Sequence, residues 1–246
     1  MQFIYLLNVI LLSRLSLGFK NEPVSKVKLI EVIIIQILLL LLFEFSLKLF
    51  LLMAAVFVLD LIIYWIENRF NNLNLIRCLS FLFYFLIFGI FSFIFIPQNF
   101  NNFFFNLISV SGNDSFISSA LIKVNWYKFN LILLGMLILL NETNFAIRYF
   151  FEKFNLIPQV PNSGETTGID KKEYNAGRII GFVERIMIFF FVLVNQYAAI
   201  GFIIAAKGFT RFRELDNIDF AEYVLIGTLL SSLSAIAVAL LIKSML

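Results

Sequence analysis

The sequence predicts an all-α protein, a polytopic transmembrane helical bundle of about seven spans, with six or eight as alternatives. Of its 246 residues, 61% are hydrophobic and only 14% are charged, and the mean hydropathy is +0.94. Soluble domains contain about 45–50% apolar and about 25% charged residues. Several uninterrupted apolar runs also approach the roughly 20 residues that a helix needs to cross a bilayer. This composition therefore fits a lipid environment.

The residue types that are missing restrict the chemistry. Histidine is absent, which removes imidazole bases and the Ser-His and Cys-His catalytic pairs. The single cysteine, Cys78, cannot form an intrachain disulfide. No phosphate-binding loop or dinucleotide glycine fingerprint occurs, and a net charge of +3 gives no reason to expect nucleic acid. The sequence assigns no catalytic residue, metal site or cofactor, and it favours a protein that is not an enzyme.

The first 150 residues form the predicted N-terminal transmembrane region, with about five spans. The apolar runs are 2–17, 29–45, 49–66, 79–96 and 129–150. The first run has no basic residue before it and no small-residue cleavage site after it, so it predicts a retained span and not a removed signal peptide. The first four runs carry bulky Leu, Ile and Phe on all sides, which is typical of lipid-facing helices.

A polar loop is predicted at 151–176, followed by a C-terminal transmembrane hairpin at 177–246. Asp170 and Glu173 match a capping box, which predicts a helix that starts near Lys171. Residues 186–206 predict the sixth span, because 21 residues at about 1.5 Å each match a hydrocarbon core of roughly 30 Å. The alternative is a break at Asn195–Gln196 that makes this segment a re-entrant hairpin.

Small residues predict how the C-terminal helices pack. Residues of this kind recur every four positions on the last helix, and the sixth span repeats the spacing. Such spacing places the small residues on one helix face and lets another backbone approach closely. The predicted helix-packing residues are Gly201, Ala205, Gly227, Ser231, Ala235 and Ala239.

Ionisable and amide side chains near membrane depth are the candidate functional residues, because such groups are costly in a membrane and often functional. The candidates are Glu142, Glu184, Arg185, Gln196, Lys207, Arg211 and Glu222. On a continuous helix, Glu184 and Lys207 would be separated by about 35 Å. We therefore expect them at opposite membrane interfaces and expect Lys207 to meet Glu222. Structural pairing and a transport or catalytic role both remain open for the set.

The last third of the chain resembles a family of bacterial multispanning membrane proteins, the domain of unknown function 3307. The similar segments are AGRIIG at 176–181, ER at 184–185, QYAAIGF at 196–202, AAK at 205–207, RF at 211–212, EL at 214–215, AEY at 221–223 and IGTLLS at 226–231. Together they cover about 70 residues. The N-terminal part of that family carries His and Asp near its start, and this chain has no His, so no function seated there carries over. The resemblance implies a multi-pass protein of the bacterial inner membrane and supplies no reaction or ligand.

Two functions of different classes follow from these observations. The first is a channel-like or transporter-like membrane component in which polar residues around the last three spans form the working part. The alternative is a non-catalytic membrane anchor or effector subunit that recruits a partner protein through the loop at 151–176. A weaker third hypothesis is a lipid-modifying enzyme that uses Glu142 or Glu184. The expected partners are the lipid bilayer and either a second copy of the chain or a partner membrane subunit.

Overall fold

In the computed structural model, the described residues are 2–19, 22–70, 72–94, 125–154, 156, 171–210 and 218–246. All regular elements within these ranges are helices, so the predicted all-α class is confirmed for them. The chain divides into two compact units, Met1–Leu137 and Ile138–Leu246. The predicted connection at 98–128 and most of the predicted polar loop at 151–176 lie outside the described residues.

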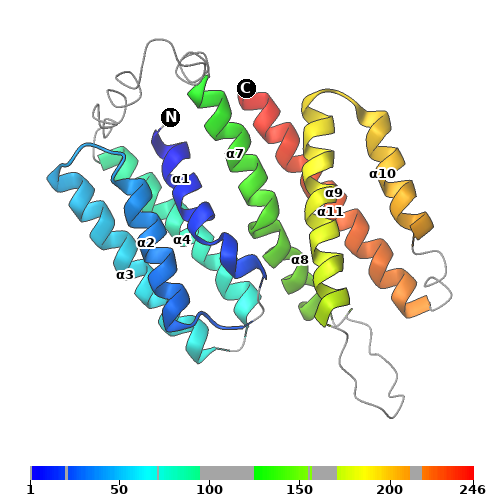
Figure 1. The fold of residues 1–246 in the computed structure, drawn as a ribbon, viewed down its shortest axis with the longest axis horizontal. Coiled ribbons are helices and arrows are strands. Elements are labelled where there is room, and N and C mark those ends of the chain that lie inside the picture. The colour runs from blue at the N-terminus through cyan, green and yellow to red at the C-terminus, as the bar shows by residue number, and fades with distance from the viewer. Residues whose placement is uncertain are drawn as a thin grey trace. The chain divides into compact units, whose positions relative to one another are not determined.

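The first unit is a bundle in which α1 is the central helix (Figure 1). Its elements are α1 (Gln2–Ser13), the short 3₁₀ helix η1 (Leu15–Phe19), α2 (Lys26–Leu40), α3 (Leu47–Arg69), α4 (Leu73–Ile94) and the first part of α7 (Trp126–Leu140). The helix α1 contacts both α2 and α4, and Leu7, Val9 and Ile10 are at most 3% exposed. A helix that is apolar all round must lie in lipid or inside a protein. The expectation of a lipid-facing helix is therefore wrong for α1, which the other helices enclose.

Serine side chains define where α2 and α3 begin. The hydroxyl of Ser25 accepts a hydrogen bond from the backbone N–H of Lys28, and that of Ser46 accepts one from Leu49. Both are N-cap bonds, which satisfy backbone donors that have no partner within the helix.

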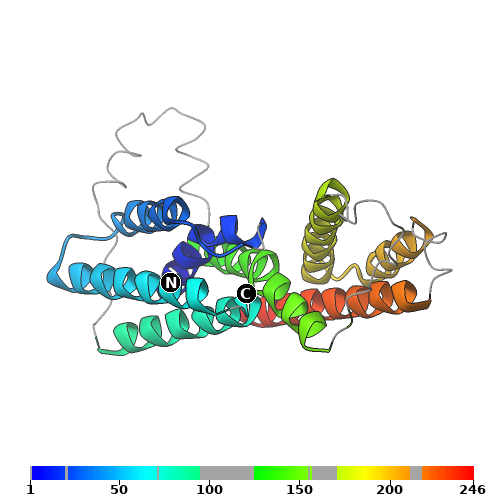
Figure 2. The same ribbon diagram turned by 90° about the horizontal axis from the view of Figure 1, so that it is seen from below.

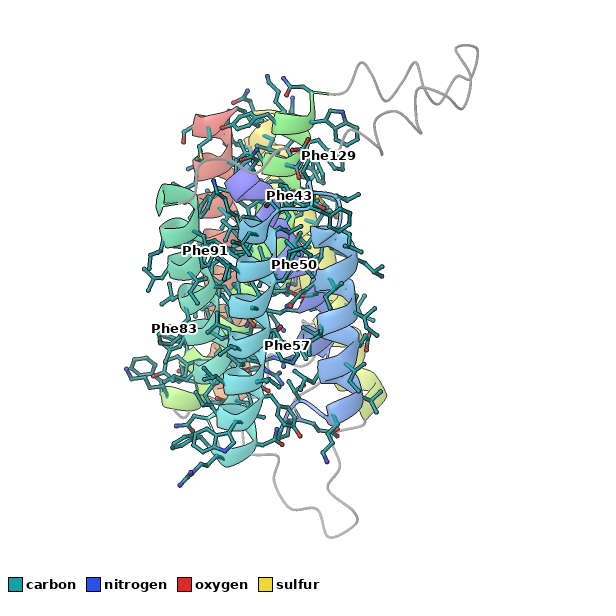
Figure 3. The ribbon with its side chains drawn as sticks, turned by 90° about the vertical axis from the view of Figure 1, so that its left-hand side faces the viewer. Phe43, Phe50, Phe57, Phe83, Phe91 and Phe129 are labelled. Atoms are coloured by element: carbon teal, nitrogen blue, oxygen red, sulfur yellow. The ribbon has the colours of Figure 1, made fainter. Side chains whose placement is uncertain are left out.

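The outer face of the first unit is apolar, as expected of a surface in contact with lipid. On α3, Phe50 and Phe57 are 57% and 46% exposed, and Phe83 on α4 is 55% exposed. Figure 3 shows aromatic and aliphatic side chains along this face of α2, α3 and α4. Water would disfavour so continuous an apolar surface.

The second unit is built around α11 (Ile218–Met245), which packs against α8 (Glu142–Lys153) and α9 (Lys171–Leu193). The shorter α10 (Tyr197–Thr210) packs against α9. Figure 2 shows α9 and α10 on the same side of α11. The described part of α9 begins at Lys171, and the predicted cap residue Asp170 lies outside the described residues.

Four helices in the described part of the chain are long and apolar enough to cross a membrane. They are Leu47–Arg69, Leu73–Phe91, Trp126–Lys153 and Ala221–Met245. The predicted count of seven is not confirmed. The first two predicted spans are short helices instead: α1 has 12 residues and α2 has 15, which correspond to about 18 and 22 Å against a hydrocarbon core of about 30 Å.

The predicted continuous sixth span is wrong, because the chain breaks between α9 and α10. The helix α9 ends at Leu193 and α10 begins at Tyr197. Between them, Asn195 has a φ of 62°, a left-handed conformation that ends helices and that Asn tolerates better than most residues. The alternative of a hairpin that folds back is the one the structure adopts. The length argument failed because α9 extends 15 residues before Ile186, to Lys171.

Candidate functional site

Polar side chains are buried throughout the interior of the first unit. Nine of them are at most 4% exposed: Asn8, Ser13, Arg14, Gln36, Asp60, Glu67, Arg77, Ser80 and Tyr84. They come from α1, α2, α3 and α4, and from the turn that follows α1. Polar and ionisable groups are rare inside membrane helices because their desolvation is costly. This network is therefore the candidate functional site.

The first layer of the network is an ion pair between Glu67 on α3 and Arg77 on α4. The Nε and Nη2 atoms of Arg77 donate to the two oxygens of Glu67 at 3.1 and 3.2 Å. The same guanidinium donates to the backbone carbonyls of Leu17 and Glu22 at 3.2 and 2.9 Å. The backbone N–H of Val24 donates to Glu67 at 3.3 Å. These bonds fix the connection between α1 and α2 to α3 and α4, which is a structural role.

The second layer lies about two helical turns away, because Asp60 and Tyr84 are each seven residues from the members of the first pair. The phenol of Tyr84 donates a hydrogen bond to Oδ1 of Asp60. The Nε2 atom of Gln36 lies 3.4 Å from the same oxygen and 3.1 Å from the hydroxyl of Ser13. Asp60 is residue 14 of the 23 residues in α3, so this layer lies close to the middle of a helix that is long and apolar enough to cross a membrane.

Arg14 joins the two layers. One of its nitrogens donates to the backbone carbonyl of Arg77 at 2.7 Å, and its guanidinium carbon lies 5.8 Å from the centroid of the Tyr84 ring. Its positive charge also acts on Asp60. The network thus holds two arginines and two carboxylates, and its formal charge is zero when Asp60 is ionised.

Asp60 differs from Glu67 in how completely it is satisfied. Both oxygens of Glu67 accept hydrogen bonds. The Oδ2 atom of Asp60 is buried and has no hydrogen-bond partner among the described residues, although Asp60 is only 4% exposed. Buried polar atoms almost always have a partner, and an exception calls for an explanation such as an ordered water, an ion or a catalytic role. This oxygen is the atom at which the site can accept one.

The second unit brings several predicted residues together in an arrangement that the sequence did not predict. The Nζ atom of Lys207 lies 2.5 Å from Oε2 of Glu184, so the prediction that these two residues mark opposite interfaces is wrong. The reversal at Asn195 removes the straight helix on which that prediction depended. Lys207 therefore pairs with α9, whereas its predicted partner Glu222 is exposed on α11.

Arg185 and Ser231 complete this second cluster. Arg185 is 5% exposed, donates to the hydroxyl of Ser231 at 3.3 Å, and lies 5.2 Å from the centroid of the Phe182 ring. A cavity of about 10 Å³ lies beside the ion pair of Glu184 and Lys207. That is room for about one water molecule, so the cluster fits a packed polar joint between helices.

The remaining candidates are separate. Glu142 is buried at the start of α8, and Gln196 is exposed in the turn before α10. Arg211 lies outside the described residues. Neither of the two cavities described here is lined by Glu142 or Gln196.

The small-residue prediction divides into two parts. Ser231, Ala235 and Ala239 lie on the buried face of α11, and a Cβ atom at Gly227 would be 3.2 Å from the Phe151 ring of α8. That face packs against neighbouring helices. By contrast, Gly201 and Ala205 are exposed on α10, and a Cβ at Gly201 would contact nothing within 4 Å. The predicted seam between these two residues and the α11 stripe is therefore wrong.

Sequence reasoning did not select the network of the first unit. Arg14, Gln36 and Asp60 each lie inside an apolar run that predicts a span. A search for single polar residues within the apolar runs, with no requirement for a motif, would have found all three. Within the described residues, no group of three or more Cys, Asp or Glu side chains could hold a metal ion.

The fold and the network define a class of protein: an α-helical protein whose apolar helices fit a membrane and whose interior contains a charged, partly unsatisfied site. No family model, no curated protein and no solved structure matches the chain.

Proposed function

We propose that this protein is a channel-like or transporter-like component of the bacterial inner membrane, and that its working centre is the Asp60 layer in the first unit. The observation that carries the proposal is the buried and unpartnered Oδ2 atom of Asp60 near the middle of α3. The proposal keeps the class that the sequence suggested and moves the working part from the last three helices to α1–α4. The proposed location in the bacterial inner membrane rests on the resemblance of the C-terminal segments to a family of bacterial membrane proteins.

The charges of the network suit an ion that binds and leaves again. Without an added ion, Arg14 and Arg77 balance Asp60 and Glu67, so the site is neutral. A proton or a monovalent cation on Asp60 changes the total to +1, and Arg14 then repels the added charge. Coulomb interactions are strong where water is excluded. The neutral network therefore admits one positive charge at Asp60 and disfavours a second.

The neighbours of Asp60 can adjust to either state. Tyr84 and Ser13 carry hydroxyls that both donate and accept, and Gln36 carries an amide with both functions. When Asp60 is ionised, Tyr84 and Gln36 donate to its Oδ1 atom. When Asp60 is neutralised, the hydroxyls can rotate without any movement of the helices. Exchange at the site therefore needs only side-chain motion.

Ion flux into proteoliposomes tests this function. The purified chain is reconstituted into vesicles that contain a pH-sensitive dye, and the rate of pH equilibration is measured after a pH jump, with the membrane potential clamped. Parallel vesicles carry a sodium or a potassium gradient and the corresponding indicator. We expect flux of one of these ions above that of empty vesicles, and we expect Asp60→Asn to reduce it at least tenfold.

Glu31→Gln is the matched control, because it removes a carboxylate that is exposed on α2. It should leave the flux within twofold of the unmodified protein. If none of the three ions moves faster than in empty vesicles, or if Asp60→Asn has no effect, the proposal is wrong. The membrane-anchor alternative then becomes the better reading.

A further inference from the structure

An apolar groove on the surface of the first unit lies beside the Asp60 layer and shares Gln36 with it. It lies between α2 and α3 and has a volume of about 230 Å³. Its lining residues are Ile33, Gln36, Ile37, Leu40, Met53, Ala54, Val56 and Phe57. Figure 3 shows α2 and α3 from the side that carries the labelled Phe57.

The surroundings of this groove indicate that it opens to the lipid. On α2, Ile34 and Leu38 are 50% and 61% exposed, and on α3, Phe57 and Val58 are 46% and 52% exposed. The helix α3 is one of the four that can cross a membrane. A molecule that enters this groove therefore comes from the hydrocarbon region and must itself be largely apolar.

Gln36 connects the groove to the acidic site. It is the only polar side chain among the groove's lining residues, and its Nε2 atom lies 3.4 Å from Oδ1 of Asp60. That distance is at the long end for an N–H···O hydrogen bond. On α3, Val56 lines the inner part of the groove and precedes Asp60 by four residues, which places both on one helix face. The Asp60 carboxylate therefore lies about one helical turn beyond Val56, with the Gln36 amide beside it.

We infer that the α2–α3 groove and Asp60 together bind a lipophilic monocation, with its apolar body in the groove and its cationic group at Oδ2 of Asp60. This inference rests on the proposed function, because the lipophilic monocation would exchange with the small cation at the same carboxylate. The groove supplies apolar contact and no charge. The unpartnered carboxylate oxygen supplies the attraction for a positive group, and rotation of Gln36 opens the way to it.

The volume and charge of the site restrict the ligand further. A cavity of about 150 Å³ holds one benzene, so 230 Å³ accommodates a body of about two small rings or an equivalent alkyl chain. The neutral network accepts one positive charge before Arg14 repels more. Neutral molecules gain only the apolar contact, and anions meet the carboxylate. The expected preference is monocation over neutral isostere, with anions excluded.

A pair of fluorescent probes tests this preference directly. The cationic probe is a dimethylaminostyryl-N-methylpyridinium ion, and the neutral probe is the same dimethylaminostyrylpyridine without the N-methyl group. Binding is measured by fluorescence anisotropy with the full chain in nanodiscs of zwitterionic lipid, with empty nanodiscs as the background. We expect saturable binding of the cation, with a Kd at least tenfold lower than that of the neutral probe.

Two substitutions separate the groove from the carboxylate. Ala54→Phe fills the groove from an exposed position on α3, and it should raise the Kd of the cation at least tenfold. Ala205→Phe makes the same change on the exposed side of α10 and should leave the Kd within twofold. Asp60→Asn should bring the Kd of the cation to that of the neutral probe.

The outcomes distinguish this inference from the proposed function. If the cation does not bind above background, or if Ala54→Phe leaves its Kd unchanged, the lipophilic-cation inference is wrong. An Asp60-dependent proton or sodium flux would then still support the proposed function. If Asp60→Asn changes neither the flux nor the cation binding, both are wrong. Since Ala54 is exposed and not part of the core, its variant should retain the thermal stability of the unmodified protein, and this is checked first.

Discussion

Replacing Arg77 with Met should be among the most destabilising single changes in the first unit. The guanidinium makes two hydrogen bonds to Glu67 and two to the carbonyls of Leu17 and Glu22, all between 2.9 and 3.2 Å. Both members of the ion pair are at most 1% exposed. Met fills similar volume but leaves the Glu67 carboxylate buried, with the Val24 N–H as a donor at 3.3 Å.

The expected loss follows from the cost of leaving one buried charge unpaired. Removing one partner of a buried ion pair costs about 3–5 kcal/mol, and the two carbonyls that lose their donor place Arg77→Met at the upper end of that range. For a chain of this size, such a loss corresponds to a Tm shift on the order of 10 °C. The assay is reversible unfolding in mixed micelles with increasing denaturing detergent, followed by circular dichroism, with Tm as a second readout.

A double-mutant cycle identifies the source of the loss. Glu67→Gln removes the other charge, and the double variant with Arg77→Met leaves no buried charge. The double variant should therefore be more stable than the sum of the single losses predicts, by about 1–3 kcal/mol. Additive losses, or a loss below about 1 kcal/mol for Arg77→Met alone, would refute the conclusion that this ion pair holds the connection between α1 and α2 to α3 and α4.

Three further predictions concern the second unit. Gly227→Leu should destabilise the protein by about 1–3 kcal/mol, because even a Cβ atom at that position would lie 3.2 Å from the Phe151 ring of α8. Leu229→Ala, at a position that is 48% exposed, should cost less. Equal losses in detergent unfolding would show that the small-residue face of α11 is not packed. Asn195→Val should cost about 1–2 kcal/mol more than Asn195→Gly in the same assay, because a β-branched residue resists the left-handed conformation. Both variants lose the hydrogen bond from Lys243 to the Asn195 side chain, so their difference reports the backbone. Equal losses would show that the turn adopts another conformation. The changes in Tm caused by Glu184→Gln and Lys207→Met should be non-additive, because the two side chains form an ion pair. Simple additivity would show that the two side chains do not interact.

The two polar layers of the first unit illustrate the difference between a structural and a functional buried charge. Glu67 and Arg77 form hydrogen bonds with each other and with the backbone around them, so their substitution should affect stability most strongly. Asp60 has one satisfied and one unpartnered oxygen. Substitution of Asp60 should affect ion flux and ligand binding more strongly than it affects stability. Comparing the two positions in both assays therefore tests the division of roles.

Some features of the fold were readable from the sequence because they depend on local composition. The excess of apolar residues predicts membrane helices, since a chain in lipid must satisfy its backbone hydrogen bonds within each helix. The packed face of α11 follows from small residues four positions apart, because that spacing repeats on one side of a helix.

Other features depend on which helices meet, and local patterns do not contain that information. The hydropathy of residues 186–206 is the same whether the chain runs straight or turns back, so the left-handed residue at Asn195 decided that Glu184 and Lys207 lie side by side. Likewise, the exposed side of α10 carries the same small-residue spacing as the buried face of α11.

The sequence by itself determined that this is an α-helical protein with apolar helices suited to a membrane, since that conclusion requires only composition and run length. Only the tertiary structure decided where its polar centre lies. Arg14, Gln36, Asp60 and Tyr84 are separated by 22 to 24 residues from one to the next along the chain. Gln36, Asp60 and Tyr84 each stand alone among apolar residues, and Arg14 lies near the end of the first apolar run. Their contacts exist because α1 is enclosed by the helices that carry the others, and the burial of all four in one interior makes an unpartnered carboxylate oxygen costly enough to indicate a function.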